Sequence, residues 1–135
     1  METTEFYGLV QEASHADTTD SAEIASEAVF ETLGETLTAG EAENVAAQLP
    51  SELAGHLEDV DHDGSGYDRE AFVERVGEHL RETELDPDEA ERYTQGVTDA
   101  LAAALTQREL QDMKAQLGVE IHSLFEGVDI DREAV

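Results

Sequence analysis

The sequence has no cysteine, no tryptophan and only seven basic residues among its 135. Without cysteine it can form no disulfide, no thiolate zinc site and no cysteine nucleophile. One lysine, Lys114, and six scattered arginines are too few for a phosphate-binding surface, so we expect neither nucleic acid nor an anionic membrane as a partner.

Long apolar runs are also missing. The longest, residues 100–105, has six residues, whereas a membrane span needs about 20. The first residues of the chain lack the basic segment and the apolar run of a signal peptide. We therefore expect a soluble, cytoplasmic protein.

Acidic residues are abundant: 34 Asp and Glu give a formal net charge of −27. Such a charge repels itself and destabilises a compact chain, unless salt is molar and the Debye length shrinks to about 3 Å. The acidic residues are spread over every segment and form no separate tail. This distribution favours a halophilic protein in a salt-rich cytoplasm, with solvent cations at its surface.

The two halves of the chain are similar. When the sequence is shifted by 68 residues, nine of the 24 positions between residues 38 and 61 are identical to their counterparts. These positions are Thr38, Glu41, Ala47, Gln48, Leu49, Glu52, Glu58, Val60 and Asp61. Similarity at a fixed spacing indicates an internal repeat. We predict repeats at residues 1–60 and 67–135, joined by a linker at residues 61–66.

Each repeat has the apolar spacing of helices. Apolar residues recur every three or four positions, as on one face of a helix, and neither repeat alternates like a strand. The two stripes are Ala22, Ala25, Val29, Leu33 and Leu37, and Ala90, Tyr93, Val97, Leu101 and Leu105. Thr38 with Glu41, and Thr106 with Glu109, have the spacing of capping boxes that open the next helix. The second long helix is expected to begin at residues 86–89, where Asp86 precedes Pro87.

These patterns predict an all-α protein in which two pseudo-symmetric four-helix repeats pack as one helical-bundle domain over residues 1–135. In the second repeat the fourth helix is expected to carry Ile121, Phe125 and Val128.

A family resemblance follows from the same residues. The first repeat ends in Gln-Leu-Pro-x-x-Leu at residues 48–53, and after the linker a Phe-x-x-x-Val helix with Phe72 and Val76 opens the second repeat. This arrangement resembles the family called domain of unknown function 2267, a group of small all-helical proteins from bacteria and haloarchaea. The resemblance implies no particular activity, ligand or catalytic residue. The second repeat departs from the pattern because it has Gly118 in place of the proline.

The segment between the repeats has the pattern of a calcium loop. Residues 59–70 match Asp-x-Asp-x-Asp-Gly-x5-Glu, the ligand spacing of an EF-hand, between two expected helices. The candidate metal ligands are Asp59, Asp61, Asp63, Ser65 and Glu70. Two features oppose this interpretation: Gly66 stands where an apolar residue pairs with a partner loop, and no second complete loop exists. The alternative is an acidic turn whose Asp, Gly and Ser serve turn formation and solvation.

Other candidate sites have less support. Glu12 and His15 have the spacing of a di-iron helix, but a second Glu-x-x-His is missing. Glu52 and His56 lie one helical turn apart, a spacing typical of a surface pair. No Gly-x-Ser-x-Gly or phosphate-binding loop is present.

The function that remains is a non-catalytic helical module that binds an unknown partner, expected to be a protein. The first alternative is a calcium-binding module that uses the loop at residues 59–70, with calcium as its only candidate cofactor. The second alternative is an enzyme of unknown type, which these residues favour least.

Overall fold

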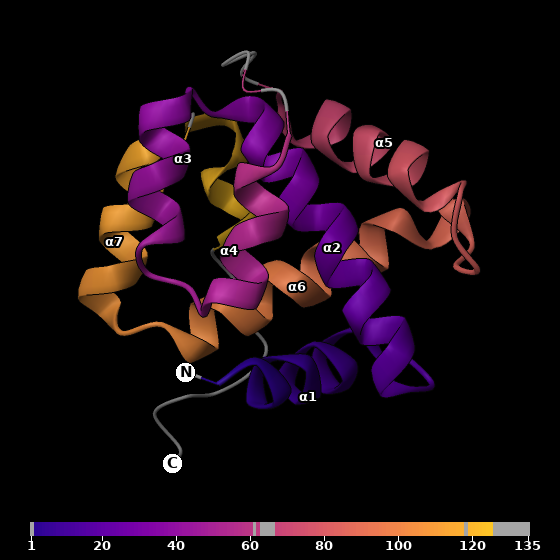
Figure 1. Cartoon of the computed structure of the whole chain (residues 1–135). Helices are drawn as coiled ribbons and strands as arrows, with labels where there is room; N and C mark the ends of the chain where they lie inside the picture. Colours follow the sequence, from indigo (N-terminus) through magenta and orange to yellow (C-terminus); the bar gives the residue numbers. More distant parts are fainter. Residues whose placement is uncertain (1, 61, 63–66, 118, 126–135) are drawn as a thin grey trace.

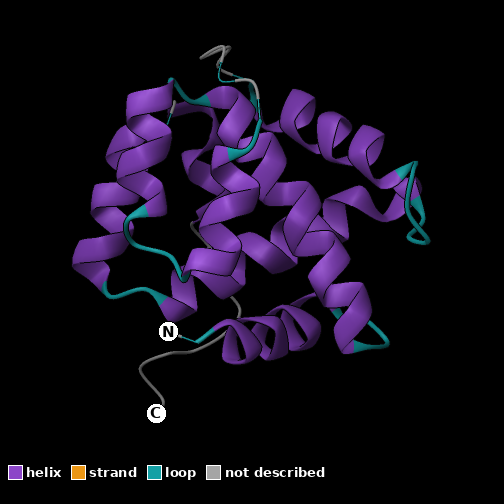
Figure 2. Ribbon diagram, in the orientation of Figure 1, coloured by secondary structure: helices purple, strands orange, loops and turns teal. Residues whose placement is uncertain are grey.

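Helices joined by short loops make up the part of the chain that the structure describes. The structure is a computed structural model, and it describes residues 2–60, 62, 67–117 and 119–125. The helices are α1 (Thr3–Ser14), α2 (Thr19–Thr36), α3 (Ala39–Ala46), α4 (Ser51–Glu58), α5 (Arg69–Leu80), the 3-10 helix η1 (Pro87–Glu89), α6 (Ala90–Ala104), α7 (Gln107–Gln116) and the 3-10 helix η2 (Val119–Phe125). None of the described residues lies in a strand (Figure 2). The all-α prediction is confirmed.

The predicted caps begin the predicted helices. The backbone N–H of Thr38 donates to Glu41 Oε1 at 2.9 Å, and the Glu41 N–H donates to Thr38 Oγ1 at 3.3 Å. The same reciprocal pair links Thr106 and Glu109 at 2.9 and 3.2 Å. Each box satisfies N–H groups that the first turn of a helix leaves without a partner.

Two segments differ from the expected α-helix. Asp86 caps a single 3-10 turn at Pro87–Glu89, with its Oδ1 2.9 Å from the Asp88 N–H, and the α-helix begins only at Ala90. The last described segment, Val119–Phe125, is a 3-10 helix as well. Its Ile121 and Phe125 are buried as expected, whereas Val128 lies outside the described residues.

Helices α2 and α6 form the centre of the molecule (Figure 1). Helix α1 packs across both of them, α5 covers their other side, and α4 packs on α2. Both predicted apolar stripes are buried in this core. The rings of Phe6 from α1 and Phe30 from α2 lie 5.7 Å apart between centroids.

One glycine allows a close helix crossing. A Cβ atom on Gly34 of α2 would lie 2.6 Å from Val60 Cγ2 and would also collide with the Leu57 carbonyl oxygen at the end of α4. Since real Cβ atoms do not approach so closely, only glycine fits here without moving α4.

Helices α3 and α7 lie side by side and antiparallel at one end of the molecule (Figure 1). The Asn44 side-chain N–H donates to Gln116 Oε1 at 3.4 Å and joins the two helices. None of the described helices is long and apolar enough to cross a membrane.

Candidate functional site

The predicted calcium loop is only partly described. Asp59 follows the end of α4 and Glu70 lies in the first turn of α5; both side chains are exposed. Asp61, Asp63 and Ser65 lie outside the described residues. Within the described ranges, no three His, Asp or Glu side chains are grouped to hold a metal ion. Calcium binding by this loop stays a prediction.

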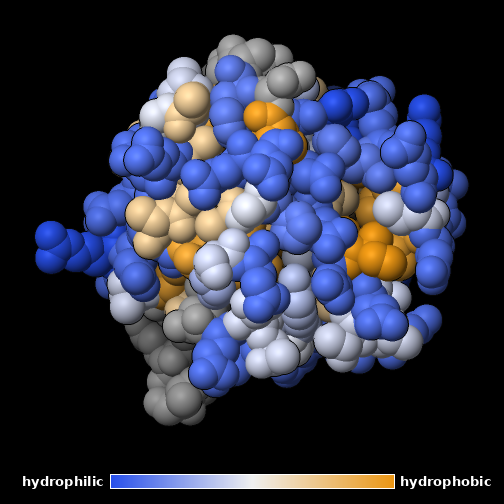
Figure 3. Space-filling model, viewed as in Figure 1, coloured by the Kyte–Doolittle hydropathy of each residue, from blue (hydrophilic) through white to orange (hydrophobic). Residues whose placement is uncertain are grey.

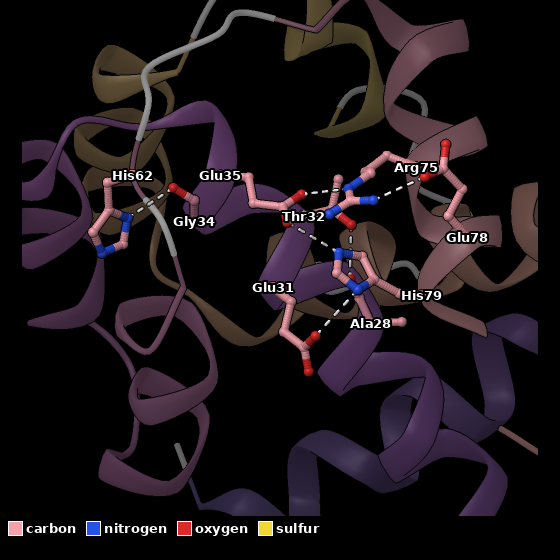
Figure 4. Close-up of polar contacts among 9 residues, drawn as sticks. All are labelled: Ala28, Glu31, Thr32, Gly34, Glu35, His62, Arg75, Glu78 and His79. Atoms are coloured by element: carbon pink, nitrogen blue, oxygen red, sulfur yellow. Dashed lines mark hydrogen bonds and ion pairs between the residues drawn. The ribbon is translucent and has the colours of Figure 1, made fainter. Parts of the chain in front are cut away.

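The described residues near this loop connect helices. His62 Nδ1 lies 2.9 Å from the Gly34 carbonyl oxygen (Figure 4), and its Nε2 lies 3.0 Å from the Glu58 carbonyl oxygen. Asp68 caps α5, because its Oδ1 accepts the Ala71 N–H at 2.8 Å. These contacts tie His62 to α2 and to the end of α4, and Asp68 sets the start of α5.

An ionic cluster connects α2 with α5 (Figure 4). The Arg75 guanidinium donates from Nε and Nη2 to the two oxygens of Glu35, both at 2.8 Å, and from Nη1 to Glu78 at 2.8 Å. The ring of His79 lies between two carboxylates, with Nδ1 3.2 Å from Glu31 and Nε2 3.3 Å from Glu35. The second contact lacks hydrogen-bond geometry, so Nε2 is left without a hydrogen bond.

The cluster keeps Glu35 ionised. The Glu35 side chain is only 13% exposed, and burial raises its pKa. The hydrogen bonds from Arg75 and the charges of His79 and Arg75 outweigh that effect, and the net pKa is lower than usual. The hydrogen bond to Glu35 in turn raises the pKa of Arg75. A carboxylate held in this way is a structural anion and a poor general acid.

The sequence held a signal for this cluster. Glu31 and Glu35 on α2, and Arg75 and His79 on α5, are each four residues apart and so share one helix face. Sequence reasoning missed the pairing because it did not predict which faces of α2 and α5 meet.

His56 also has a different partner from the predicted one. Its Nε2 lies 3.5 Å from Glu27 Oε1 of α2, on a neighbouring helix. Burial raises the pKa of Glu27, His56 opposes this rise, and Glu23 and Glu31 add to it. Burial and the same acidic surroundings raise the pKa of Tyr7 to about 12. The pair of His56 and Glu27 therefore links α4 to α2. Tyr7 stays protonated at neutral pH.

A hollow of about 240 Å³ lies where the α3–α4 connection meets the end of α6 and the start of α7. We call it the corner hollow. Its lining residues are Ala47, Gln48, Leu49, Pro50, Ala104, Leu105 and Glu109. Figure 3 shows tan and orange atoms on this side of the molecule, and orange atoms also on the right side and near the top, among mostly blue residues. The corner hollow therefore combines apolar side chains with the polar side chains of Gln48 and Glu109.

One polar atom in the wall of the corner hollow has no partner. Gln48 Oε1 is buried, and no group in the described part of the chain donates a hydrogen bond to it. An unsatisfied buried acceptor is uncommon in folded proteins and calls for an explanation.

The chain was compared with known proteins. The comparison with curated proteins found no match to the chain. The model of one family, described as "Uncharacterized conserved protein (DUF2267)", matches residues 3–124. This range contains every described helix through α7 and nearly all of η2. The chain therefore belongs to the DUF2267 family of uncharacterized conserved proteins.

Proposed function

We propose that this chain is a non-catalytic helical interaction module that binds a partner protein at the corner hollow. The observation that carries this proposal is the hollow itself, whose lining joins apolar residues (Leu49, Pro50, Ala104 and Leu105) with the polar residues Gln48 and Glu109. Concave surfaces between helices are common binding sites for a peptide or a helix.

The size of the hollow favours a protein partner over a small-molecule ligand. Pockets for small molecules and cofactors typically enclose about 300–1,000 Å³. The corner hollow, at about 240 Å³, is below that range and suits one or two apolar side chains of a docking segment.

The charged clusters support a module without catalysis. Arg75 holds Glu35 in a bidentate pair, and the lowered pKa of Glu35 suits an interhelical bridge. Catalytic acids and bases instead need a pKa near the working pH.

We also propose that the fold arose from two pseudo-symmetric repeats in a salt-rich cytoplasm. Contacts between helices support the two repeats. Helix α1, the first helix of the first repeat, packs on α6 of the second, and α5, the first helix of the second repeat, packs on α2 of the first. The excess of 34 acidic over 7 basic residues supports the salt-rich setting, where screening reduces self-repulsion.

A cross-linking experiment tests the interaction module. Because the chain has no cysteine, Ala47→Cys and Ala115→Cys each provide one thiol for a photoreactive label. Both alanines are exposed and have the same place in the two repeats, but only Ala47 lines the corner hollow. In native extract at molar salt, we expect one defined protein adduct from position 47 that unlabelled protein competes away. The same adducts from position 115, or none from position 47, would contradict the proposal.

A further inference from the structure

We infer that His79 is a pH-sensitive latch: with both ring nitrogens protonated it holds α5 on α2, and with a neutral ring it lets α5 open. This inference does not depend on the corner hollow. It is carried by the position of the ring between two carboxylates of α2 (Figure 4) and by a difference between α5 and the corresponding helix α1.

Both ring nitrogens of His79 face groups that only accept hydrogen bonds. Nδ1 lies 3.2 Å from Glu31 Oε2, and Nε2 lies 3.3 Å from Glu35 Oε2. An ionised carboxylate has no proton to donate, and a neutral imidazole has only one N–H. In the neutral ring, one nitrogen would therefore turn its lone pair towards a carboxylate oxygen. The doubly protonated ring instead attracts both carboxylates.

The contact with Glu35 depends most directly on the charge of the ring. It lacks hydrogen-bond geometry, so its attraction comes from charge alone. The side chains of His79 and Glu35 are only 18% and 13% exposed, and such a pair is screened less by salt than an exposed pair is. Glu35 stays ionised because its net pKa is lower than usual. When the ring loses a proton, this attraction is lost while the carboxylate keeps its charge.

The other charged groups around α5 do not pair with His79. On its own helix, Arg75 binds Glu35 and Glu78. Helices α6, η1 and η2 also pack on α5, and their described charged and titratable side chains are Glu91, Arg92, Asp99, Asp88, Glu89 and His122. In the described part of the chain, none of these forms an ion pair with His79. Glu31 and Glu35 are therefore the groups that respond to the charge of the ring.

The first helix of the other repeat has no such latch. Helices α1 and α5 each have a buried Phe-x-x-x-Val pair: Phe6 with Val10, and Phe72 with Val76. In this alignment, α1 has Ala13 where α5 has His79, and it has an apolar leucine where α5 has Arg75. Helix α1 is instead packed so closely on α6 that a Cβ atom on Gly96 would lie 2.5 Å from Ser14 Cβ. The ionic tie is thus specific to α5.

The latch controls whether an apolar helix face is exposed. Phe72, Val76 and Leu80 of α5 are fully buried in the core. Histidine changes charge between about pH 5 and pH 8, a range in which carboxylates are ionised. Towards the lower end of this range the ring ties α5 to α2. Towards the upper end the tie weakens, and α5 opens locally more often.

Two NMR measurements across this pH range, in molar KCl, test the latch. Long-range proton–nitrogen spectra of the His79 ring distinguish two protonated nitrogens from either neutral tautomer. Amide hydrogen exchange, corrected for the intrinsic exchange rates, measures the opening of α5. As the ring loses its proton, we expect the protection of buried α5 amides to fall about tenfold and to become lower than that of α1. Both changes should have the same midpoint.

Three variants isolate the role of the ring. His79→Gln keeps an N–H donor without the charge, so α5 should exchange at every pH as it does in the wild type with a neutral ring. Glu31→Gln places an amide N–H opposite Nδ1, which a neutral ring can accept, so the pH dependence should become weaker. The matched control is His56→Gln, because His56 also pairs with a glutamate of α2 but through Nε2 alone. Its α5 should keep the pH dependence of the wild type.

The contrary results are equally specific. A ring with a single N–H throughout the pH range would overturn the inference, as would α5 protection that stays constant while the ring titrates. Undiminished pH dependence in both His79→Gln and Glu31→Gln would assign the effect to another group. Equal protection of α5 and α1 at every pH would mean that α5 opens only when the whole chain unfolds, and the latch would be wrong. None of these results bears on the corner hollow, so the proposed function stands or falls separately.

Discussion

Replacing Gly34 by alanine should destabilise the protein, although alanine is the better helix former. Gly34 lies in the last turns of α2, directly under the end of α4. The new Cβ would lie 2.6 Å from Val60 Cγ2 and would also meet the Leu57 carbonyl oxygen. Since carbon atoms pack at about 3.5–4.0 Å, α4 has to move away by roughly 1 Å.

The magnitude follows from two opposing terms. Alanine in place of glycine in a helix contributes about 1 kcal/mol of stability. Overpacking a tight contact costs about 1–3 kcal/mol, and here the upper value applies because the obstacle includes backbone. Movement of α4 also loosens Leu57, which is fully buried, and disturbs the hydrogen bond of His62 to the Gly34 carbonyl. We expect a net loss of about 2 kcal/mol or more, and a melting temperature lower by roughly 8 °C.

Gly8→Ala is the matched control. Gly8 lies inside α1, and a Cβ built on it has no atom within 4 Å. The same substitution should there stabilise the protein by about 0.5–1 kcal/mol. Thermal and urea unfolding, followed by circular dichroism in molar KCl, measure both variants. If Gly34→Ala is as stable as Gly8→Ala, the close crossing of α2 and α4 is wrong.

Four other predictions concern the core, the ionic cluster, the surface and the loop. Leu33→Ala and Leu101→Ala remove side chains that are 1% and 0% exposed, so each should cost about 2–5 kcal/mol in urea unfolding; a loss under about 0.5 kcal/mol at either would break the proposed equivalence of the repeats. Because the folded-state pKa of Glu35 lies below its ordinary value of 4.5, its contribution to stability is complete above that pH and is lost as the pH falls through the folded-state value. Glu35→Gln should therefore be less stable at neutral pH, where it removes the bidentate carboxylate partner of Arg75 and leaves only Glu78, and should lose less stability than the wild type on acidification below pH 4.5; parallel pH profiles would contradict this. Removing salt should lower the helical circular dichroism signal, and molar KCl should restore it; full helicity in dilute buffer would refute the halophilic interpretation. If the loop binds calcium, titration should saturate and Glu70→Gln should weaken it greatly, with magnesium a poor substitute; equal, weak responses to both ions, unchanged in the variant, would indicate a solvated turn.

Local patterns in the sequence were sufficient to predict the helices and their buried faces. The spacing of Val29, Leu33 and Leu37 describes one face of a helix, and the capping boxes at Thr38 and Thr106 depend only on residues three positions apart. Such short-range features form in the same way wherever the helix is packed.

Contacts between helices were not predictable in the same way. The pairing of Arg75 with Glu35 depends on how α5 is rotated against α2, and the pairing of His56 with Glu27 depends on how α4 lies on α2. These quantities are set by packing of the whole core, which no single helix encodes.

The most direct test of the account measures whether a side chain of the partner enters the corner hollow. The segment that cross-links at position 47 is titrated calorimetrically into the wild type, into Ala47→Leu, in which leucine occupies the hollow, and into the matched control Ala115→Leu. Burial of one aliphatic side chain contributes about 1.5–3 kcal/mol, so Ala47→Leu should bind about 10- to 150-fold more weakly, while Ala115→Leu should bind like the wild type. Equal affinity of Ala47→Leu and the wild type would contradict the assignment of the corner hollow as the binding site.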